Sequence, residues 1–144
     1  MLLSGSCHCR NITFMLDWPA DSAEIPARAC CCSFCAKHGG VWTACAAGAL
    51  EIHVRDWTLV SRYAFATRTA DFHVCSRCGA VPLVTSRIDD HLYAVVSVHA
   101  LDNVSASMLC PVSVSFDGES EQDRLARRTR AWIANVKFAP GHGA

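Results

Sequence analysis

Ten cysteines in a chain of 144 residues constrain the fold more than any other feature of the sequence. Seven of them fall in three short motifs, Cys7-x-Cys9, Cys30-x-Cys32-x-x-Cys35 and Cys75-x-x-Cys78. Residues 1–5 contain no basic segment and no long apolar run, so we expect no signal peptide and a cytoplasmic protein. Cysteines in a reducing compartment are thiols or metal ligands, and disulfides are rare there. We therefore interpret the three motifs as metal-binding motifs rather than as a disulfide framework.

The first and last motifs together supply four thiolates. Cys7, Cys9, Cys75 and Cys78 are enough to enclose a tetrahedral zinc ion, because each short-spaced pair already holds two sulfurs together. Such an ion would tie the start of the chain to its middle and contribute on the order of 10 kcal/mol or more to folding. Iron in the same four-sulfur site and two unrelated pairs of thiols are the alternatives.

The middle motif predicts a second metal site with a free position. Cys30 and Cys32 point to the same side of an extended segment, and a tight turn then brings Cys35 round. Three protein ligands leave one position of a tetrahedral zinc ion open, which is typical of catalytic zinc. The alternative is that these cysteines are small buried hydrophobic residues. Cys31 should point away from its neighbours, so we expect it to be a bystander.

Two residues after this motif are candidates for ligand binding. Lys37 and His38 follow the last cysteine directly and are placed to interact with an anionic ligand. Ordinary surface residues are the alternative interpretation. Two further cysteines, Cys45 and Cys110, lie in apolar segments, and we expect them in the core.

The composition excludes several classes of function. Apolar residues make up 51% and charged residues 18% of the chain, as in a globular protein, and the length fits one domain over residues 1–144. Lysine plus arginine and aspartate plus glutamate each number 13, so no net field attracts nucleic acid or an anionic membrane. No stretch approaches the roughly 20 apolar residues of a membrane-spanning helix.

Alternating apolar and polar residues along most of the chain predict a mainly β fold. We expect strands over residues 12–16, 41–47, 50–54, 59–67, 81–85, 91–98 and 111–116. Hairpins should join 41–47 to 50–54 and 81–85 to 91–98. The only predicted helix is short and C-terminal, over residues 120–136, and Ser120 and Asp123 resemble a capping box at its start. We interpret its four arginines as a solvated face, with a nucleic-acid or acidic-partner surface as the alternative: Arg124, Arg127, Arg128 and Arg130.

Three segments in order carry a resemblance to a known family: G-S-C-H-C at residues 5–9, C-C-C-S-F-C at 30–35 and C-S-R-C-G at 75–79. Together they resemble the glutathione-dependent formaldehyde-activating enzyme family, which is related to the centromere protein V group. Lys37, residues 96–102 and the arginine-rich end also match, so the similarity spans nearly the whole chain.

This resemblance implies a mostly antiparallel β fold of the β-tent type with two zinc ions per chain. The first and last cysteine motifs would hold the structural ion, and Cys30, Cys32 and Cys35 would hold the second ion near the glutathione site. The implied activity is that of a carbon–sulfur lyase, which condenses glutathione with formaldehyde to S-hydroxymethylglutathione. Zn²⁺ with three thiolates carries a net negative charge and is a weak Lewis acid, so we expect it to hold or exchange a thiol.

Two other functions are compatible with the same sequence. One is a glutathione or thiol carrier that binds without catalysing. The other is a zinc-stabilised module that binds a macromolecule through the arginine-rich end. The neutral overall charge argues against the module, and the free position at the three-cysteine motif favours a small-molecule site.

Overall fold

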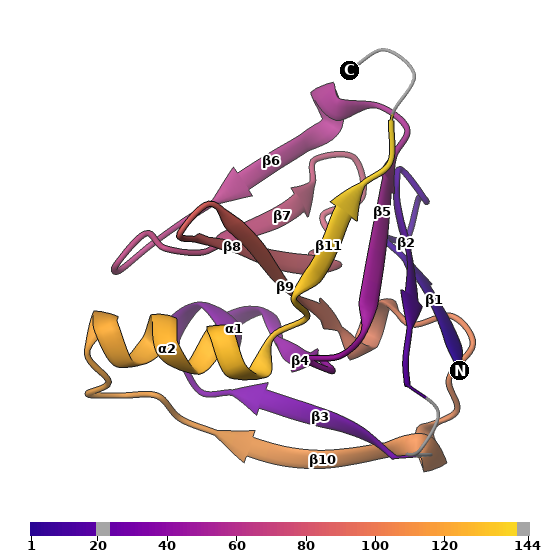
Figure 1. Cartoon of the computed structure of the whole chain (residues 1–144). Coiled ribbons are helices and arrows are strands. Elements are labelled where there is room, and N and C mark those ends of the chain that lie inside the picture. The colour runs from indigo at the N-terminus through magenta and orange to yellow at the C-terminus, as the bar shows by residue number, and fades with distance from the viewer. Residues whose placement is uncertain (20–23, 141–144) are drawn as a thin grey trace.

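Two β-sheets make up most of the structure, a computed structural model that describes residues 1–19 and 24–140 (Figure 1). The smaller sheet has the strand order β1-β2-β5-β11, where the strands are β1 (Leu2–Ser6), β2 (Ile12–Asp17), β5 (Ala49–Val54) and β11 (Asn135–Phe138). The larger sheet has the order β10-β3-β4-β9-β8-β7-β6. Its strands are β3 (Ile25–Cys30), β4 (Val41–Thr43), β6 (Val60–Tyr63), β7 (Asp71–Cys75), β8 (Leu83–Ile88), β9 (His91–Ser97) and β10 (Leu109–Val114). The mainly β fold expected from the alternating pattern is confirmed.

The helices are few and short. Two α-helices are described, α1 (Ser33–His38) and α2 (Glu121–Ala131), with three single turns of 3₁₀-helix, η1 (Trp57–Leu59), η2 (Val98–Ala100) and η3 (Ala106–Met108). In Figure 1 the larger sheet curves from β6 at one edge to β10 along the base, and α2 lies between these two arms. The smaller sheet closes the opposite side.

The two sheets enclose the hydrophobic core, and two isolated bridges among the described residues connect them. Isolated bridges pair Gly5 with Leu101 and Ala94 with Ile133, so each joins a residue of one sheet to a residue beside the other. At the first bridge Gly5 faces Phe14, and a Cβ atom at this position would lie 2.2 Å from Cζ of the Phe14 ring. Only glycine therefore allows β1 to lie against this almost fully buried phenylalanine.

One predicted hairpin is confirmed and the other is wrong. β8 and β9 pair antiparallel through a two-residue turn, and Asp89 and Asp90 adopt the positive φ values, 51° and 63°, that such turns require. β4 and β5, by contrast, belong to different sheets, because β4 pairs with β3 and β9 while β5 pairs with β2 and β11. An alternating pattern fixes which face of a strand is buried, but it does not select the partner strand.

Most strand pairs are antiparallel, as the resemblance implies, and two are parallel. β10 pairs in parallel with β3, and β11 pairs in parallel with β5. Both join a C-terminal strand to a strand much earlier in the chain. Parallel pairing requires a long connection, and the chain between residues 54 and 135 provides one for β11.

The C-terminal helix begins where the sequence predicts and ends earlier. The Asp123 backbone N–H donates to the Ser120 hydroxyl at 3.1 Å, as in a capping box. The helix ends at Ala131 because Trp132 is extended (φ −80°, ψ 158°), and residues 135–138 form a strand instead. Pairing with β5 and burial of Ile133 override the helical pattern of this segment.

The structure describes no helix of the length and apolar character needed to cross a membrane, within residues 1–19 and 24–140. The longest described helix, α2, has 11 residues and carries four arginines.

Candidate metal centres and substrate cavity

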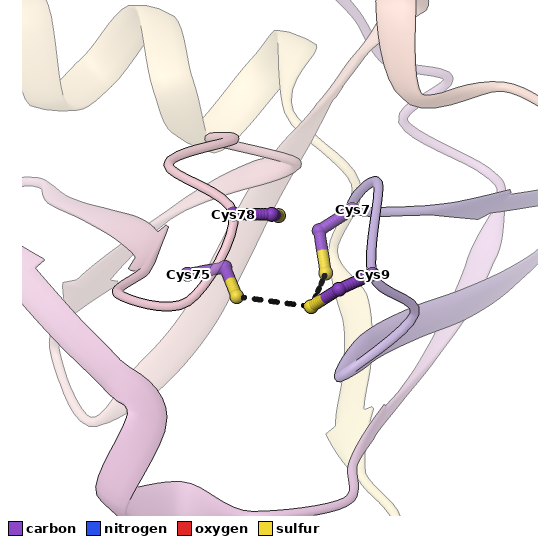
Figure 2. A group of neighbouring side chains, drawn as sticks. All are labelled: Cys7, Cys9, Cys75 and Cys78. Atoms are coloured by element: carbon purple, nitrogen blue, oxygen red, sulfur yellow. Dashed lines mark hydrogen bonds between the residues drawn. The ribbon is translucent and has the colours of Figure 1, made fainter.

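Four cysteine sulfurs converge between two loops. Cys7 and Cys9 lie in the loop that joins β1 to β2, and Cys75 and Cys78 lie at the end of β7 and in the turn that follows (Figure 2). The turns are tight because the Arg10 N–H donates to the Cys7 carbonyl at 3.1 Å and the Gly79 N–H donates to the Cys75 carbonyl at 2.7 Å. Local backbone bonds therefore place each pair of thiols before any metal binds.

The spacing of these four sulfurs fits a tetrahedral metal ion. All four Sγ atoms lie within 4.8 Å of one another, with 3.8 Å between Cys7 and Cys9 and 3.5 Å between Cys9 and Cys75. Zinc–sulfur bonds of about 2.3 Å place the sulfurs of a tetrahedron about 3.8 Å apart. A disulfide needs an S–S distance of about 2.05 Å, so these are thiols and not bridges.

Three of these thiols, Cys7, Cys75 and Cys78, have pKa values shifted in opposite directions. Burial raises the pKa of Cys7 to about 12 and also raises the pKa of Cys75. Burial opposes ionisation of Cys78 too, but backbone N–H groups of Ala80 and Cys9 outweigh it and lower the pKa of Cys78 to about 6. Sulfurs this close cannot all carry charge alone, and a divalent cation is what allows all of them to ionise.

The second group of thiols is built at the junction of β3 and α1. Cys30 ends β3, Cys32 is the N-cap of α1, and Cys35 lies in the first turn of that helix. Their Sγ atoms lie within 4.8 Å of one another. The sequence predicts only a tight turn between Cys32 and Cys35, whereas the structure has a helix, because Cys32 Sγ accepts the Cys35 N–H at 3.3 Å and serves as a helix cap.

The backbone and an indole hold Cys35 in place. Nε1 of Trp42 donates to Sγ of Cys35 at 3.3 Å, and the Gly40 N–H donates to the Cys35 carbonyl at 2.9 Å. Gly39 ends the helix with φ 74°, a left-handed conformation that favours glycine. Cys30 receives a hydrogen bond from the Cys35 thiol, which lowers the pKa of Cys30 to about 5, while the same bond and burial raise the pKa of Cys35.

A cavity of about 180 Å³ opens beside this second group, and all three of its cysteines line the wall. The apolar lining comes mainly from six side chains of β4, β7, β8, β9 and the loops: Trp42, Phe65, Phe72, Val84, Val95 and Trp132. Soft sulfur donors and these apolar side chains therefore share the wall of one cavity. It can hold a small ligand close to the thiols and shield it from water.

Comparison with known proteins identifies the family of this chain. Residues 2–116, most of the chain, match the sequence model described as "Glutathione-dependent formaldehyde-activating enzyme". The chain belongs to this family. A crystal structure of a Rhodobacter sphaeroides protein is similar, with a TM-score of 0.52 and 26% sequence identity over 72% of this chain and 92% of that chain. No curated protein sequence matches the chain significantly.

The residues that match the family model end before α2, yet this helix supplies much of the cavity wall. Four arginines and one carboxylate line the cavity: Arg28, Arg124, Arg127, Arg128 and Asp117. The interpretation of the arginine-rich helix as a solvated face is therefore wrong for three of its four arginines. Arg130 is exposed, as expected.

A helical spacing in the sequence is the signal that identifies these arginines. Positions 124, 127 and 128 are related by three and four residues and lie on one face of a helix, whereas position 130 lies elsewhere. Arg28 gave no such signal, because β3 and α2 are far apart in the sequence and only the fold brings them together.

The two residues predicted to contact an anionic ligand lie away from this cavity. Lys37 is exposed at the surface. His38 lines a second, larger cavity of about 880 Å³, together with His99, Phe34 and Tyr63. Burial and the charge of His99 lower the pKa of His38. The second cavity also reaches Cys7, so it extends toward the four-cysteine site.

The remaining cysteines lie outside both groups. Cys31 is exposed, and its N–H donates to the Val114 carbonyl at 3.0 Å. Cys45 is half-buried and packs against the core. Cys110 is exposed on β10, so the expectation of a core position is wrong for this residue. β10 is an edge strand, and one side of an edge strand faces solvent even where its sequence is apolar.

Proposed function

We propose that this protein is a zinc-dependent carbon–sulfur lyase-like enzyme that joins glutathione to formaldehyde and forms S-hydroxymethylglutathione. The observation that carries the proposal is the group of three sulfurs, Cys30, Cys32 and Cys35, on the wall of a cavity that a small molecule can enter. Membership of the family supports the choice of glutathione and formaldehyde. As part of the same proposal, residues 1–144 form one domain in the cytoplasm.

The donor sets of the two thiol groups fit two zinc ions with different roles. The four-cysteine group would hold a structural ion, since four sulfur ligands complete a tetrahedron. The three-cysteine group would hold an ion that, when bound, favours the thiolate form of a substrate thiol.

The chain's own residues provide orientation and a dry environment for the reaction. Trp42 orients Cys35 through its indole N–H, and Phe65 and Phe72 exclude water from the cavity. In the reaction, the sulfur of glutathione forms a bond to the formaldehyde carbon. The carbonyl π electrons move to the oxygen, which takes up the proton that the thiol released. Lys37 and His38 would contact the part of glutathione that extends outside the cavity.

A carrier that binds a thiol without catalysis is the second candidate. It is favoured by the side chains that line the small cavity, because none of the described lining residues is a histidine or a lysine. The ionisable side chains there are cysteines, arginines and Asp117. Asp117 is therefore the one carboxylate among the described lining residues that can act as a general acid or base.

Formation of S-hydroxymethylglutathione, followed by NMR exchange spectroscopy above the uncatalysed rate, tests the proposal. We expect catalysis by the zinc-loaded protein, its loss in Cys32→Ser and its retention in Cys31→Ser, a matched change one residue away on an exposed side chain. Zinc content per chain is measured on the same samples. Two zinc ions and glutathione binding without rate enhancement would favour the carrier. Equal activity of both variants would refute the assignment of the site.

A further inference from the structure

The small cavity is rich in arginine although the chain as a whole carries no net charge. Lysine plus arginine and aspartate plus glutamate each number 13, yet four arginines and a single carboxylate line this cavity. Part of this charge is balanced nearby, because Glu119 accepts hydrogen bonds from Arg124 Nε at 3.3 Å and from Arg127 at 3.0 and 3.1 Å. The concentration of cations at one cavity indicates an anionic ligand.

Arg128 is the one buried cation in this set of four arginines, and it lacks a carboxylate partner among the described residues. Its side chain is buried, with 8% of the residue exposed, and no carboxylate of the described residues forms an ion pair with it. Nη1 donates to the hydroxyls of Thr69 at 2.8 Å and Ser86 at 3.2 Å. Nε is buried without any hydrogen-bond partner in the described part of the chain. A buried charge with an unsatisfied donor is costly unless an anion completes the site.

The surroundings of Arg128 fix its position without neutralising it. Its guanidinium lies 5.0 Å from the ring centroid of Trp132, which also lines the cavity. Burial lowers the pKa of Arg128 to about 10, with smaller contributions from the charges of Arg127 and Arg124. The side chain therefore remains a cation at neutral pH. The guanidinium is therefore rigidly placed beside the cavity that the three cysteines share.

We infer that Arg128 binds a carboxylate of the substrate in this cavity, so that the compound reaching Cys30, Cys32 and Cys35 is anionic. The inference rests on the proposed function in one respect, namely that the substrate enters this cavity. An arginine fork recognises a planar carboxylate through parallel N–H···O bonds, which suits the unpaired side of this guanidinium. With about 180 Å³ the cavity is smaller than ordinary ligand pockets of roughly 300–1,000 Å³, so it takes one end of a peptide-sized ligand.

The carboxylate has two possible sources. It belongs either to the thiol, since glutathione carries two carboxylates, or to an aldehyde that itself carries a carboxylate. Two matched ligand pairs separate the sources by isothermal titration of the full-length zinc-loaded protein. Glutathione and its dimethyl ester differ only in the carboxylates of the thiol. S-carboxymethylglutathione and S-methylglutathione differ only in a carboxylate at the position of the aldehyde.

Arg128→Gln removes the charge, Arg128→Lys keeps it, and Arg130→Gln is the matched control on the exposed face of the same helix. We expect wild-type protein to prefer the carboxylate member of one pair by about tenfold to a hundredfold. Arg128→Gln should abolish this preference, Arg128→Lys should retain part of it, and Arg130→Gln should leave it unchanged. A preference within the first pair identifies the thiol's carboxylate, and one within the second pair identifies the aldehyde's.

Equal binding of both members in both pairs by the wild-type protein would overturn the inference, and this measurement does not depend on whether Arg128→Gln folds. Unchanged ligand preference in Arg128→Gln together with faster loss of zinc would also overturn the inference, because the charge of Arg128 would then stabilise the cysteine thiolates instead of binding a carboxylate. The rate of S-hydroxymethylglutathione formation is measured separately. A carboxylate preference without catalysis refutes the proposed function alone, and catalysis without a preference refutes this inference alone.

Discussion

Nε1 of Trp42 and Sγ of Cys35 are joined by a hydrogen bond of 3.3 Å, and the backbone of Gly40 lies directly against both groups. A Cβ atom at position 40 would lie 2.9 Å from Nε1 of Trp42 and 3.0 Å from Sγ of Cys35. The position of one proposed zinc ligand thus depends on the absence of a side chain five residues further along. This contact links the backbone turn after α1 to the chemistry of the three-cysteine group.

Gly40→Ala should therefore damage the second metal site. The new methyl group must displace Cys35 or Trp42, both of which are buried, and overpacking of this kind costs about 1–3 kcal/mol of folding free energy. We expect about one zinc ion per chain instead of two, measured by elemental analysis, and a lower melting temperature.

Gly39→Ala is the control for that change. Its φ of 74° strains any other residue by about 1–2 kcal/mol, but nothing lies within 4 Å of a Cβ atom there. This variant should lose a similar amount of stability and keep both zinc ions. If Gly40→Ala also keeps two zinc ions with unchanged affinity, the contact with Cys35 does not control the site.

Removal of one sulfur from the four-cysteine group should affect folding rather than ligand binding. In Cys7→Ser and Cys78→Ser the remaining three thiols hold a metal less well, and much of the roughly 10 kcal/mol or more that a structural zinc contributes is lost. We expect poor solubility and a broad, low-temperature melting transition by circular dichroism. Cys110→Ser, on an exposed cysteine, is the control and should melt like the wild type. Melting of Cys78→Ser at the wild-type temperature would show that this group has no structural role.

The sequence predicts the ligand groups better than the strand pairing, for a physical reason. The spacing of Cys30, Cys32 and Cys35 is local, and the turn geometry that brings such residues together is contained in the same few residues. The partner of a strand depends on distant segments, so the predicted hairpin between residues 41–47 and 50–54 is wrong although each strand exists. The cavity could not be predicted for the same reason, because Arg28 on β3 and Arg128 on α2 line it together only in the folded chain.

The two proposed zinc ions should differ in their resistance to chelators. Four thiolates from two preorganised turns would complete one tetrahedron, whereas three thiolates on the cavity wall would leave their ion accessible to a competing ligand. We expect a chromogenic chelator to remove about one zinc ion per chain quickly and the other only on unfolding. Addition of millimolar glutathione should change the fast phase alone. A single kinetic phase for both ions, unchanged in Cys32→Ser, would contradict the assignment of two distinct sites.

Glu119 neutralises part of the positive charge of the arginines that line the cavity. Its replacement should change both the affinity for the ligand and the pH dependence of folding stability. It pairs with Arg124 and Arg127, and the Arg127 hydrogen bonds, with smaller contributions from Arg124, hold the pKa of the Glu119 carboxyl below its usual value. A lowered carboxyl pKa stabilises the folded state above the unfolded pKa of about 4.3, and this stabilisation is lost as the pH falls through the folded pKa.

Glu119→Gln should accordingly be less stable than the wild type at pH 7, by about 1 kcal/mol, with the difference disappearing in acid. At pH 7 the same variant should bind the carboxylate ligand that Arg128 recognises a few-fold more tightly, because two arginines beside the cavity lose their counter-charge. The gain should shrink as salt is added, since screening weakens the interaction of charges that are not in direct contact. Urea unfolding between pH 3.5 and 7 and titration at two salt concentrations check both effects. Weaker carboxylate binding by Glu119→Gln, with the fold intact, would mean that Glu119 positions the arginines and that their geometry outweighs their net charge.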